Sequence, residues 1–451
     1  MITKSLIDRG WYQVTFSDIA KSLKRGPFGG NLKKAYFVPK GYKVYEQQHA
    51  INKDYSLGKY FINEEKYQEL KNFEVGPGDY IVSCSGTIGR LYRLSEKAPY
   101  GVINQALLKI TLEDRLIEHS YFSYLFQSEY FQRNILSDAR GTGMKNLSGM
   151  KEIKVVPVLV PPLPEQRKIS KMLDELFSKL DNAIANLQRA KGKLEVYRQA
   201  VLEKAFEGEL TKEWREKHKD ISSNFSFVSL KQIADVATGA TPKKANSSYW
   251  NEGEFPWVTS GALNNTFVNK ASDFITEKAL KETNCKIFPK GTLLIAMYGE
   301  GKTRGKCSEL AIDAATNQAI AAILIKSDSQ ESKKYLKWFF IKNYNDIRML
   351  SSGGVQPNLN LTKIKETKIP FPAIQEQHQI VQEIETRLSV CDNILANIDE
   401  GLEKAEALRQ SILKKAFEGR LLSEIELEAC RREQDWVSAE ELLEKIKASE
   451  E

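Results

Sequence analysis

The sequence has little cysteine and little histidine, and neither is arranged for cross-linking or metal binding. Its 451 residues include five cysteines and four histidines, all scattered, and no Cys-x-x-Cys pair. A disulfide framework or a zinc site is therefore not expected. We expect no bound metal and a reducing compartment.

Long hydrophobic runs are also missing. No apolar run approaches the roughly 20 residues that a membrane-spanning helix needs, and the first residues lack the apolar segment of a secretory signal. The chain is nevertheless 41% hydrophobic and carries 20 Phe, 18 Tyr and 6 Trp, which is enough for folded cores. We therefore expect a cytoplasmic protein with no membrane partner.

Recognisable enzymatic motifs are scarce. No Gly-x-Ser-x-Gly, no Asn-Pro-Pro-Tyr-like methyltransferase motif and no paired-carboxylate nuclease pattern appears, so no catalytic residue is predicted. Residues 296–303, AMYGEGKT, approach a phosphate-binding loop, but alanine stands where the pattern requires its first glycine. A second Gly-basic stretch follows where a helix N-terminus should meet the phosphate. A nucleotide-binding ATPase with a degenerate phosphate loop stays open as an alternative.

The net charge is +7 and the pI about 8.8. This mild excess permits a polyanionic partner without demanding one. The distribution of the basic residues is therefore more informative than their number.

The chain contains an internal repeat. Residues 165–208 and 376–419 align without a gap, and 18 of 44 positions are identical. Both copies begin with Glu-Gln and end with Lys-Ala-Phe-Glu-Gly, and fainter echoes precede them, such as Asn104-Gln105-Ala106 and Asn317-Gln318-Ala319. The whole unit, a globular segment followed by a helix, is therefore duplicated.

Each repeated segment predicts a long helix with one apolar seam. In the first copy, apolar residues recur at alternating steps of four and three: Ile169, Leu173, Leu176, Leu180, Ala183, Leu187, Ala190, Leu194, Tyr197 and Val201. The second copy follows with Ile380, Ile384, Cys391, Ile394, Ile398, Ala405, Leu408 and Ile412. Prolines suit the loop before each helix, and Gly208 and Gly419 suit its end. The favoured arrangement is an antiparallel pair in which the two seams bury each other; the alternative is that each seam packs on its own domain.

The segments around the helices predict two α+β domains. Turn signals precede short apolar runs at 80–83 and 292–296, further strands are expected at 107–110 and 321–325, and helices at 117–136 and 332–350. The predicted fold class is α+β, with two such domains separated by a pair of long antiparallel coiled-coil helices and related by an internal pseudo-twofold repeat.

Glycine-rich loops with basic and amide side chains occur at equivalent places in both halves. Glycine lets the backbone approach a ligand, while Arg, Lys, Asn and Gln hold phosphates or read base edges. Any single loop could equally be a solvated surface, but the recurrence favours DNA binding. The candidate DNA-binding residues are Lys24, Arg25, Asn31, Lys33, Ser85, Thr87, Arg90, Arg140, Lys145, Thr241, Lys243, Lys244, Tyr298, Lys302, Thr303, Arg304, Lys306, Gln356 and Asn358.

Two variable domains, each followed by a helix that opens with Pro-x-Pro and Glu-Gln and closes with Lys-Ala-Phe-Glu-Gly, resemble the specificity subunit of type I restriction-modification systems. The resemblance spans nearly the whole chain. It departs from the pattern at residues 373–375, inserted before the second Glu-Gln, and in the tail beyond Leu422, where Ser438 predicts the start of a last helix up to Ile446.

The resemblance implies a noncatalytic subunit that recognises a bipartite, asymmetric site in double-stranded DNA and directs adenine methylation and restriction by its partners. Those partners would be two methyltransferase subunits and two restriction-translocase subunits. S-adenosylmethionine, ATP and magnesium would be bound by the partners, and none by this chain. A coiled-coil scaffold that binds no DNA stays open as a further alternative. The expected domains are recognition domain 1 (1–164), central spacer helix (165–217), recognition domain 2 (218–372), C-terminal spacer helix (373–422) and helical tail (423–451).

Overall fold

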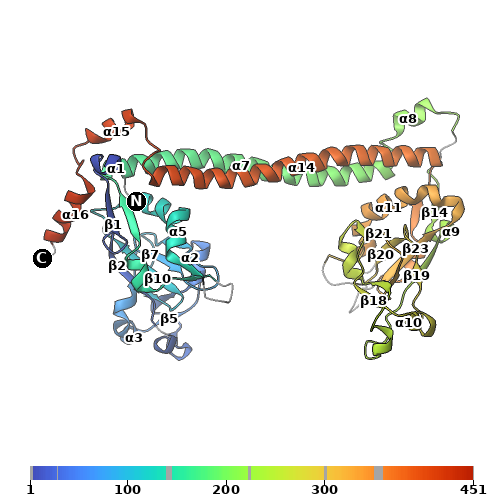
Figure 1. The fold of residues 1–451 in the computed structure, drawn as a ribbon, viewed down its shortest axis with the longest axis horizontal. Helices are drawn as coiled ribbons and strands as arrows, with labels where there is room; N and C mark the ends of the chain where they lie inside the picture. Colours follow the sequence, from blue (N-terminus) through green and yellow to red (C-terminus); the bar gives the residue numbers. More distant parts are fainter. Residues whose placement is uncertain are drawn as a thin grey trace. The chain divides into compact units, whose positions relative to one another are not determined.

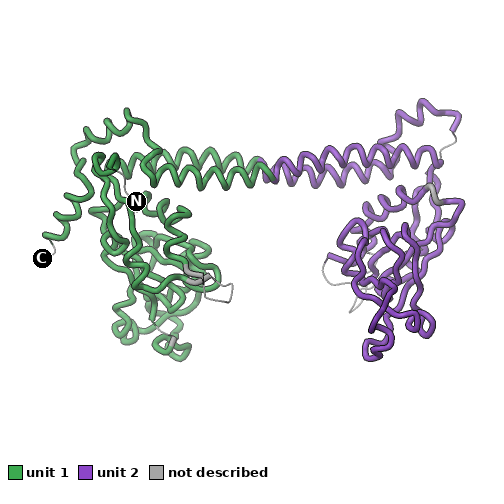
Figure 2. The backbone as a smooth tube through the Cα atoms, viewed as in Figure 1, with its two compact units in different colours: residues 1–186, 400–451 green, residues 187–399 purple. Residues whose placement is uncertain are grey.

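The computed structural model describes residues 4–27, 29–138, 145–221, 225–298, 302–349 and 359–449. The chain forms two compact units (Figure 2). Unit 1 comprises residues 1–186 and 400–451, and unit 2 comprises residues 187–399. Two 44-residue helices, α7 (Leu163–Phe206) and α14 (Ile374–Phe417), each contribute to both units.

Unit 1 holds the first α+β domain and the C-terminal tail (Figure 1). Its helices are α1 (Lys4–Asp8), α2 (Gln47–Asn52), α3 (Glu64–Glu69), α4 (His119–Gln127), α5 (Glu129–Ile135), α6 (Met150–Lys154), α15 (Glu424–Arg431) and α16 (Ala439–Ala448), besides its parts of α7 and α14. Its strands are β1 (Tyr12–Thr15), β2 (Ala20–Arg25), β3 (Phe37–Val38), β4 (Tyr42–Tyr45), β5 (Phe61–Ile62), β6 (Glu74–Val75), β7 (Tyr80–Ser83), β8 (Leu91–Arg93), β9 (Gly101–Ile103), β10 (Leu107–Leu112), β11 (Leu136–Asp138), β12 (Lys145–Leu147) and β13 (Pro157–Val160).

Unit 2 holds the second α+β domain (Figure 1). Its helices are α8 (Lys212–Lys217), α9 (Leu230–Ile233), α10 (Glu277–Glu282), α11 (Lys333–Lys342), α12 (Tyr344–Met349) and α13 (Leu361–Lys365), besides its parts of α7 and α14. Its strands are β14 (Phe227–Ser229), β15 (Ala234–Thr238), β16 (Phe255–Val258), β17 (Phe267–Val268), β18 (Asp273–Ile275), β19 (Ile287–Phe288), β20 (Leu293–Ala296), β21 (Cys307–Leu310), β22 (Ala314–Thr316), β23 (Ile320–Ile325) and β24 (Lys368–Pro370).

The two domains share one strand topology. The central sheet has the antiparallel order β2-β10-β7-β8 in unit 1 and β15-β23-β20-β21 in unit 2, where β17 adds a fifth strand parallel to β21. The outer sheet is β3-β5-β4-β9-β6 in one and β18-β16-β22-β19 in the other, with one parallel pair in each, β4·β9 and β16·β22. A third pair, β1·β13 or β14·β24, joins the ends of each domain. The duplication predicted from the helical repeat therefore extends through both domains, and the α+β class is confirmed.

The long helices end as the sequence predicts. Gly208 has a φ of +77° and Gly419 a φ of +68°, left-handed conformations that favour glycine. In the first helix the amide of Glu209 donates to the carbonyl of Lys204 at 2.9 Å, and Arg420 donates likewise to Lys415 at 2.8 Å in the second. These bonds are those of a helix-ending Schellman motif. At the other end, α7 begins two residues earlier than its Glu-Gln, so Pro164 lies in the first turn and not in the preceding loop.

The seam of each helix is buried where the helix meets a domain, and in α14 also at Cys391, Ile398 and Ala405, which lie outside the domain cores. In unit 1, Ile169, Leu173 and Phe177 enter the core that is built on Phe16, Phe122 and Phe131. In unit 2, the side chains that enter the core from the two helices are Val201, Leu202, Ala205, Phe206, Ile380, Val381, Ile384 and Leu388. Four predicted seam residues are exposed instead: Ala183, Tyr197, Ile394 and Leu408. The heptad pattern is therefore wrong at these four positions, because a single pair of helices leaves part of each apolar stripe open to solvent.

Within each unit the two helices also pair with each other, as the favoured arrangement requires. In unit 2, Lys191 bonds Asp399 at 2.6 Å and Arg198 pairs with Asp392. The second ion pair lies seven residues later in α7 and seven residues earlier in α14 than the first, which is the register of an antiparallel pair. In unit 1, Arg409 pairs with Asp181 and lies over the ring of Phe177.

Two predicted helices are each divided in two. The helix expected at 117–136 is α4 and α5, because Ser128 has an extended backbone and its hydroxyl accepts from the amide of Phe131 at 3.3 Å, which starts a new helix. The helix expected at 332–350 is α11 and α12, separated at Asn343. In the tail, Ser438 caps α16 through the amide of Glu441, and this helix ends two residues beyond Ile446.

Candidate nucleic-acid interface

Two of the predicted DNA-binding loops of unit 1 lie at one end of the strands of its central sheet, which we call the loop edge. Strand β2 ends at Arg25, which pairs with Leu108 near the start of β10. Ser83, the last residue of β7, pairs with Leu107. Because these strands are antiparallel, the loop after β2, the loop after β7 and the turn before β10 emerge together.

Unit 2 repeats this arrangement. Thr238, the last residue of β15, pairs with Ala321 near the start of β23, and Ala296, the last residue of β20, pairs with Ile320. The loops 239–244 and 297–306 therefore emerge beside the turn 317–319. Within each domain, the fold brings together loops that are 60 to 80 residues apart in the sequence.

Most predicted side chains in these loops are exposed. The exposed ones are Lys24, Arg25, Asn31, Lys33, Ser85, Thr87 and Arg90 in unit 1, and Thr241, Lys243, Lys244, Tyr298 and Lys302 in unit 2. Thr303, Arg304 and Lys306 are half-buried. Arg140, Gln356 and Asn358 lie outside the described residues, and only the backbone of Lys145, in β12, is described.

The loop between β20 and β21 is held by its neighbours. The Nζ of Lys306 donates to Oδ1 of Asn264 at 2.9 Å, and the Thr303 hydroxyl reaches the same oxygen at 3.4 Å. From α12, the Tyr344 hydroxyl donates to the carbonyl of Lys302 at 2.6 Å. These bonds hold residues 302–306, while the side chain of Lys302 remains exposed and available to a phosphate.

A basic and aromatic cluster lies at the loop after β15. The Nζ of Lys244 lies 4.2 Å from the ring centre of Trp250 and 5.6 Å from that of Trp257, and 3.4 Å from a carboxylate oxygen of Asp273. The indole of Trp257 donates to the carbonyl of Ala240 at 3.0 Å, which anchors the loop after β15 to the outer sheet. The position of Lys244 is therefore set by aromatic faces and one carboxylate.

Sequence reasoning missed three amide residues at these edges. Gln105 and Gln318 are exposed in the turns before β10 and β23, and Asn264 anchors Lys306 from a 3-10 helix at 260–264. The echo of Asn-Gln-Ala between the two halves was the available signal for the two glutamines. Nothing in the sequence signals Asn264, because its partner follows it by 42 residues.

The geometry around residues 296–303 is not that of a phosphate-binding loop. Residue Ala296 ends β20, and the next element after the loop is β21, which pairs antiparallel with β20 through Ile295 and Cys307. A phosphate-binding loop leads from a strand into a helix whose N-terminus meets the anion. A strand in this place disfavours the ATPase alternative and leaves a basic hairpin at the sheet edge.

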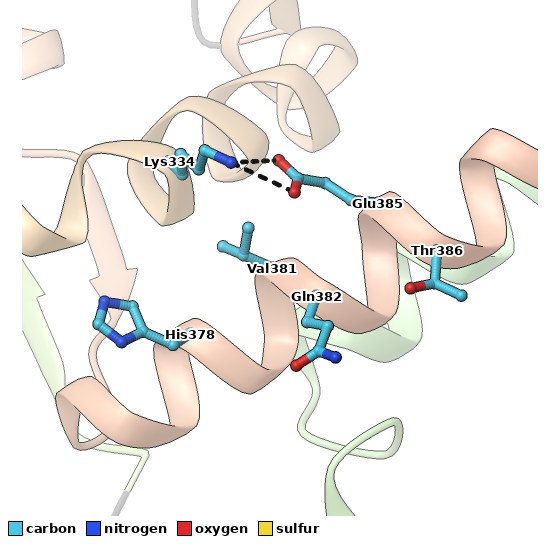
Figure 3. Close-up of a pocket in the computed structure, with 6 residues that line it drawn as sticks. All are labelled: Lys334, His378, Val381, Gln382, Glu385 and Thr386. Carbon is cyan, nitrogen blue, oxygen red and sulfur yellow. Dashed lines mark hydrogen bonds and ion pairs between the residues drawn. The ribbon is translucent and has the colours of Figure 1, made fainter.

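A separate hollow of about 330 Å³ lies between α11 and α14 in unit 2 (Figure 3). The Nζ of Lys334 on α11 is 3.1 Å from the carboxylate of Glu385 on α14, with Val381 close by and His378 one helical turn earlier. The ion pair ties the domain to the helix. This hollow lies where α11 packs on α14, and it is separate from the predicted DNA-binding loops.

The fold defines a class of protein that carries two copies of one α+β domain, each followed by a long helix. The family model for the type I restriction modification DNA specificity domain matches the chain twice, at residues 9–189 and 222–404. These matches cover well over half of the chain, and the protein belongs to this family.

Several curated proteins are similar to this chain. It is 26% identical over 373 residues to the EcoDI specificity subunit of Escherichia coli, covering 77% of this chain and 80% of that protein. It is 24% identical over 385 residues to the EcoKI specificity subunit of E. coli strain K12, covering 83% and 82%. A third relative, the MjaIX specificity subunit of Methanocaldococcus jannaschii, is 31% identical over 204 residues, 44% of each chain.

Solved structures have the same fold. The HsdS subunit from Thermoanaerobacter tengcongensis matches with a TM-score of 0.54 and 17% identity, over 91% of this chain and 97% of that one. A chain from a study of complex assembly and conformational transition in the type I R-M system matches with a TM-score of 0.67 and 16% identity, over 91% and 98%. Among the described residues, no helix is both long and apolar enough to cross a membrane.

Proposed function

We propose that this chain is the DNA sequence-specificity subunit of a type I restriction-modification complex and that each of its α+β domains reads one half of a bipartite site. The observation that carries the proposal is the repeated loop edge. Both domains present the same three loops in the same order, yet the side chains at them differ: β2 ends with Lys24 and Arg25 where β15 ends with Ala237 and Thr238. Loops that share a scaffold and differ in side chains would read different bases, so the whole site would be asymmetric.

The long helices would serve as the spacer between the two half-sites. Each is continuous for 44 residues, roughly 66 Å at the rise of an α-helix. Two domains on such a spacer would read half-sites on one face of the duplex, about one helical turn apart, with an unread gap between them. The five domain ranges expected from the sequence form part of this proposal.

The chain would act without chemistry of its own. Two methyltransferase subunits would bind S-adenosylmethionine and methylate adenines in the site, and two restriction-translocase subunits would use ATP and magnesium, in the cytoplasm. The specificity chain would determine which DNA sequence the complex modifies.

Methylation assays with and without the partner test this proposal. The purified chain, incubated with DNA and tritiated S-adenosylmethionine, is expected to transfer no methyl group, and adding its methyltransferase subunit is expected to give adenine methylation at one interrupted sequence. Sequencing the methylated positions then gives both half-sites and their gap. Methylation by the chain alone would overturn the noncatalytic role, and a reconstituted complex that methylates without sequence preference would overturn the specificity role. Failure to bind any DNA duplex, at low salt concentration as well as at high, would favour the scaffold alternative.

A further inference from the structure

The turn before the central strand is built identically in both domains. In unit 1 the Oδ1 of Asn104 accepts from the amide of Ala106 at 3.0 Å, and in unit 2 the Oδ1 of Asn317 accepts from the amide of Ala319 at 3.1 Å. The residue between them is an exposed glutamine in both cases, Gln105 or Gln318.

The neighbouring loops also pack closely beside this turn in both domains, on Asn104 in unit 1 and on Thr316, the residue before Asn317, in unit 2. A side chain on Gly26 would place its Cβ 1.9 Å from the carbonyl oxygen of Asn104, and one on Gly239 would place it 1.8 Å from that of Thr316. Such distances leave room for glycine alone, so the loop after the edge strand packs backbone to backbone on the turn. The loop after the next strand is bonded to it as well, by Cys84 to Ala106 and Met297 to Ala319, each at 2.8 Å.

In unit 2 the glutamine is also oriented. The hydroxyl of Thr241 donates to Oε1 of Gln318 at 2.6 Å. The carbonyl oxygen retains a second lone pair, and both hydrogens of the amide nitrogen are left for another partner. Thr241 therefore acts as a positioning residue for Gln318.

We propose that Gln105 and Gln318 each read one adenine in the major groove, and that this adenine is the base that the two half-sites have in common. The inference rests on the proposed function. A glutamine amide, with one acceptor and a donor side by side, matches the N6 amino group and N7 of adenine. The surrounding loops differ between the domains while this residue and its turn are the same, so what it reads is common to both half-sites.

The proposed hydrogen bond to N7 of adenine can be tested with 7-deazaadenine, which lacks this nitrogen. The complex of the full chain with its methyltransferase subunits is titrated with its cognate duplex, in which each adenine in turn is replaced by 7-deazaadenine. With the natural chain, one substitution in each half-site is expected to weaken binding about 2- to 10-fold, the range for the loss of one of the two hydrogen bonds. In the Gln105→Ala variant, 7-deazaadenine should no longer weaken binding in one half-site but should still do so in the other. In the Gln318→Ala variant, the two half-sites should exchange these roles.

The unchanged half-site is an internal control in each variant. Gln127→Ala, at an exposed glutamine on α4 whose amide bonds the carbonyl of Ser123, should leave both sensitivities intact. Gln105→Glu and Gln318→Glu keep the size of the side chain but lose the donor to N7, and should behave like the alanine variants. Thr241→Val should reduce the sensitivity in the second half-site, and Thr241→Ser should restore it.

Three results overturn the inference while leaving the proposed function intact: no adenine sensitive to loss of N7 in the natural complex, sensitivity unchanged in the glutamine variants, or an equal loss of affinity on cognate and random duplex. The last would make both glutamines contacts to the phosphate backbone. A natural complex with no sequence preference at all would instead overturn the proposed function, and the inference with it.

Discussion

Arg9 lies against Glu165, with its Nη2 3.0 Å from Oε2 of a carboxylate that is completely buried. The indole of Trp11 donates to the same oxygen at 2.7 Å, and Nη1 of Arg9 donates to the carbonyl of Gly419 at 2.6 Å. One guanidinium therefore joins the first turn of α7 to the glycine that follows the end of α14.

Unit 2 contains the same clasp from different parts of the chain. Arg215 pairs with the buried Glu376 and donates to the carbonyl of Gly208 at 2.7 Å, and the Thr211 hydroxyl donates to Glu376 at 2.6 Å. The Glu-Gln and Lys-Ala-Phe-Glu-Gly motifs thus meet at one arginine in each unit. This contact accounts for their repetition at the start and the end of both helices.

We expect Arg9→Met to lower the free energy of unfolding of unit 1 by about 3 kcal/mol, because it leaves a buried carboxylate with Trp11 as its main donor. Urea denaturation of the full chain measures the loss of free energy of unfolding. Hydrogen exchange then shows in which of the two units the loss occurs. The matched control is Arg133→Met, which removes an exposed pair with Glu129 on one helix and should cost less than about 1 kcal/mol. Equal effects of the two substitutions would show that the clasp contributes little to stability.

Lys302→Ala should weaken binding of the assembled complex to any duplex. The side chain is exposed on a loop that Tyr344 and Asn264 hold in place, so its loss should remove one phosphate contact without unfolding the hairpin. The plot of log affinity against log salt concentration should flatten by about one unit of slope. Lys286→Ala, another exposed lysine of the same domain, is the control and should leave the slope unchanged. ATP affinity lost in Lys302→Ala would revive the nucleotide-binding alternative.

The sequence predicted the scaffold well because its signals are local or repeated. Strand β7 matches the predicted range 80–83, and both glycine helix ends were expected from position alone. The break at Ser128 was missed because a serine within an apolar pattern fits either a helix interior or a cap, and packing decides between them.

The candidate site was predicted as a set of loops, and its hydrogen-bonding partners were not. The Thr241–Gln318 bond joins residues 77 apart, and the Lys306–Asn264 bond joins residues 42 apart. Such pairings arise from strand order, which a single sequence does not specify. The exposed positions in the seams, such as Ile394 and Leu408, were mistaken for the same reason: a period shows that a face is apolar, while burial depends on how many elements cover it.

Alkylating reagents should not reach Cys84 in the folded chain, although it begins a predicted DNA-binding loop. The residue is 1% exposed, and burial raises the pKa of its thiol to about 11. At pH 8 only about one thiol in a thousand would then be the reactive thiolate, against roughly a quarter for an unperturbed cysteine. Mass spectrometry after brief iodoacetamide treatment should find Cys84 unmodified in the native chain and modified in urea, with DNA binding of the treated complex unchanged. Rapid modification of Cys84 in the native chain would contradict the packing of this strand end.

Inserting seven residues into α7 after Ala190 should change the spacing of the recognised site and leave the bases read in each half-site unchanged. One heptad adds roughly 10 Å of helix, about three base pairs of B-DNA, and keeps the apolar face in phase. The insertion point lies where Lys191 pairs with Asp399, in a stretch of helix held by side chains of α14 and outside the domain core. Because α14 would then be one heptad short, the matching insertion after Gly401 should be made in the same chain.

The measurement is the methylated sequence of the reconstituted complex, with the singly and doubly extended chains compared with the natural one. An extended chain that folds and methylates with its original gap would show that the helices do not set the spacing. Insertion of seven residues between the exposed Lys219 and Asp220, which lie between α8 and β14, controls for chain length alone and should leave the gap as it was.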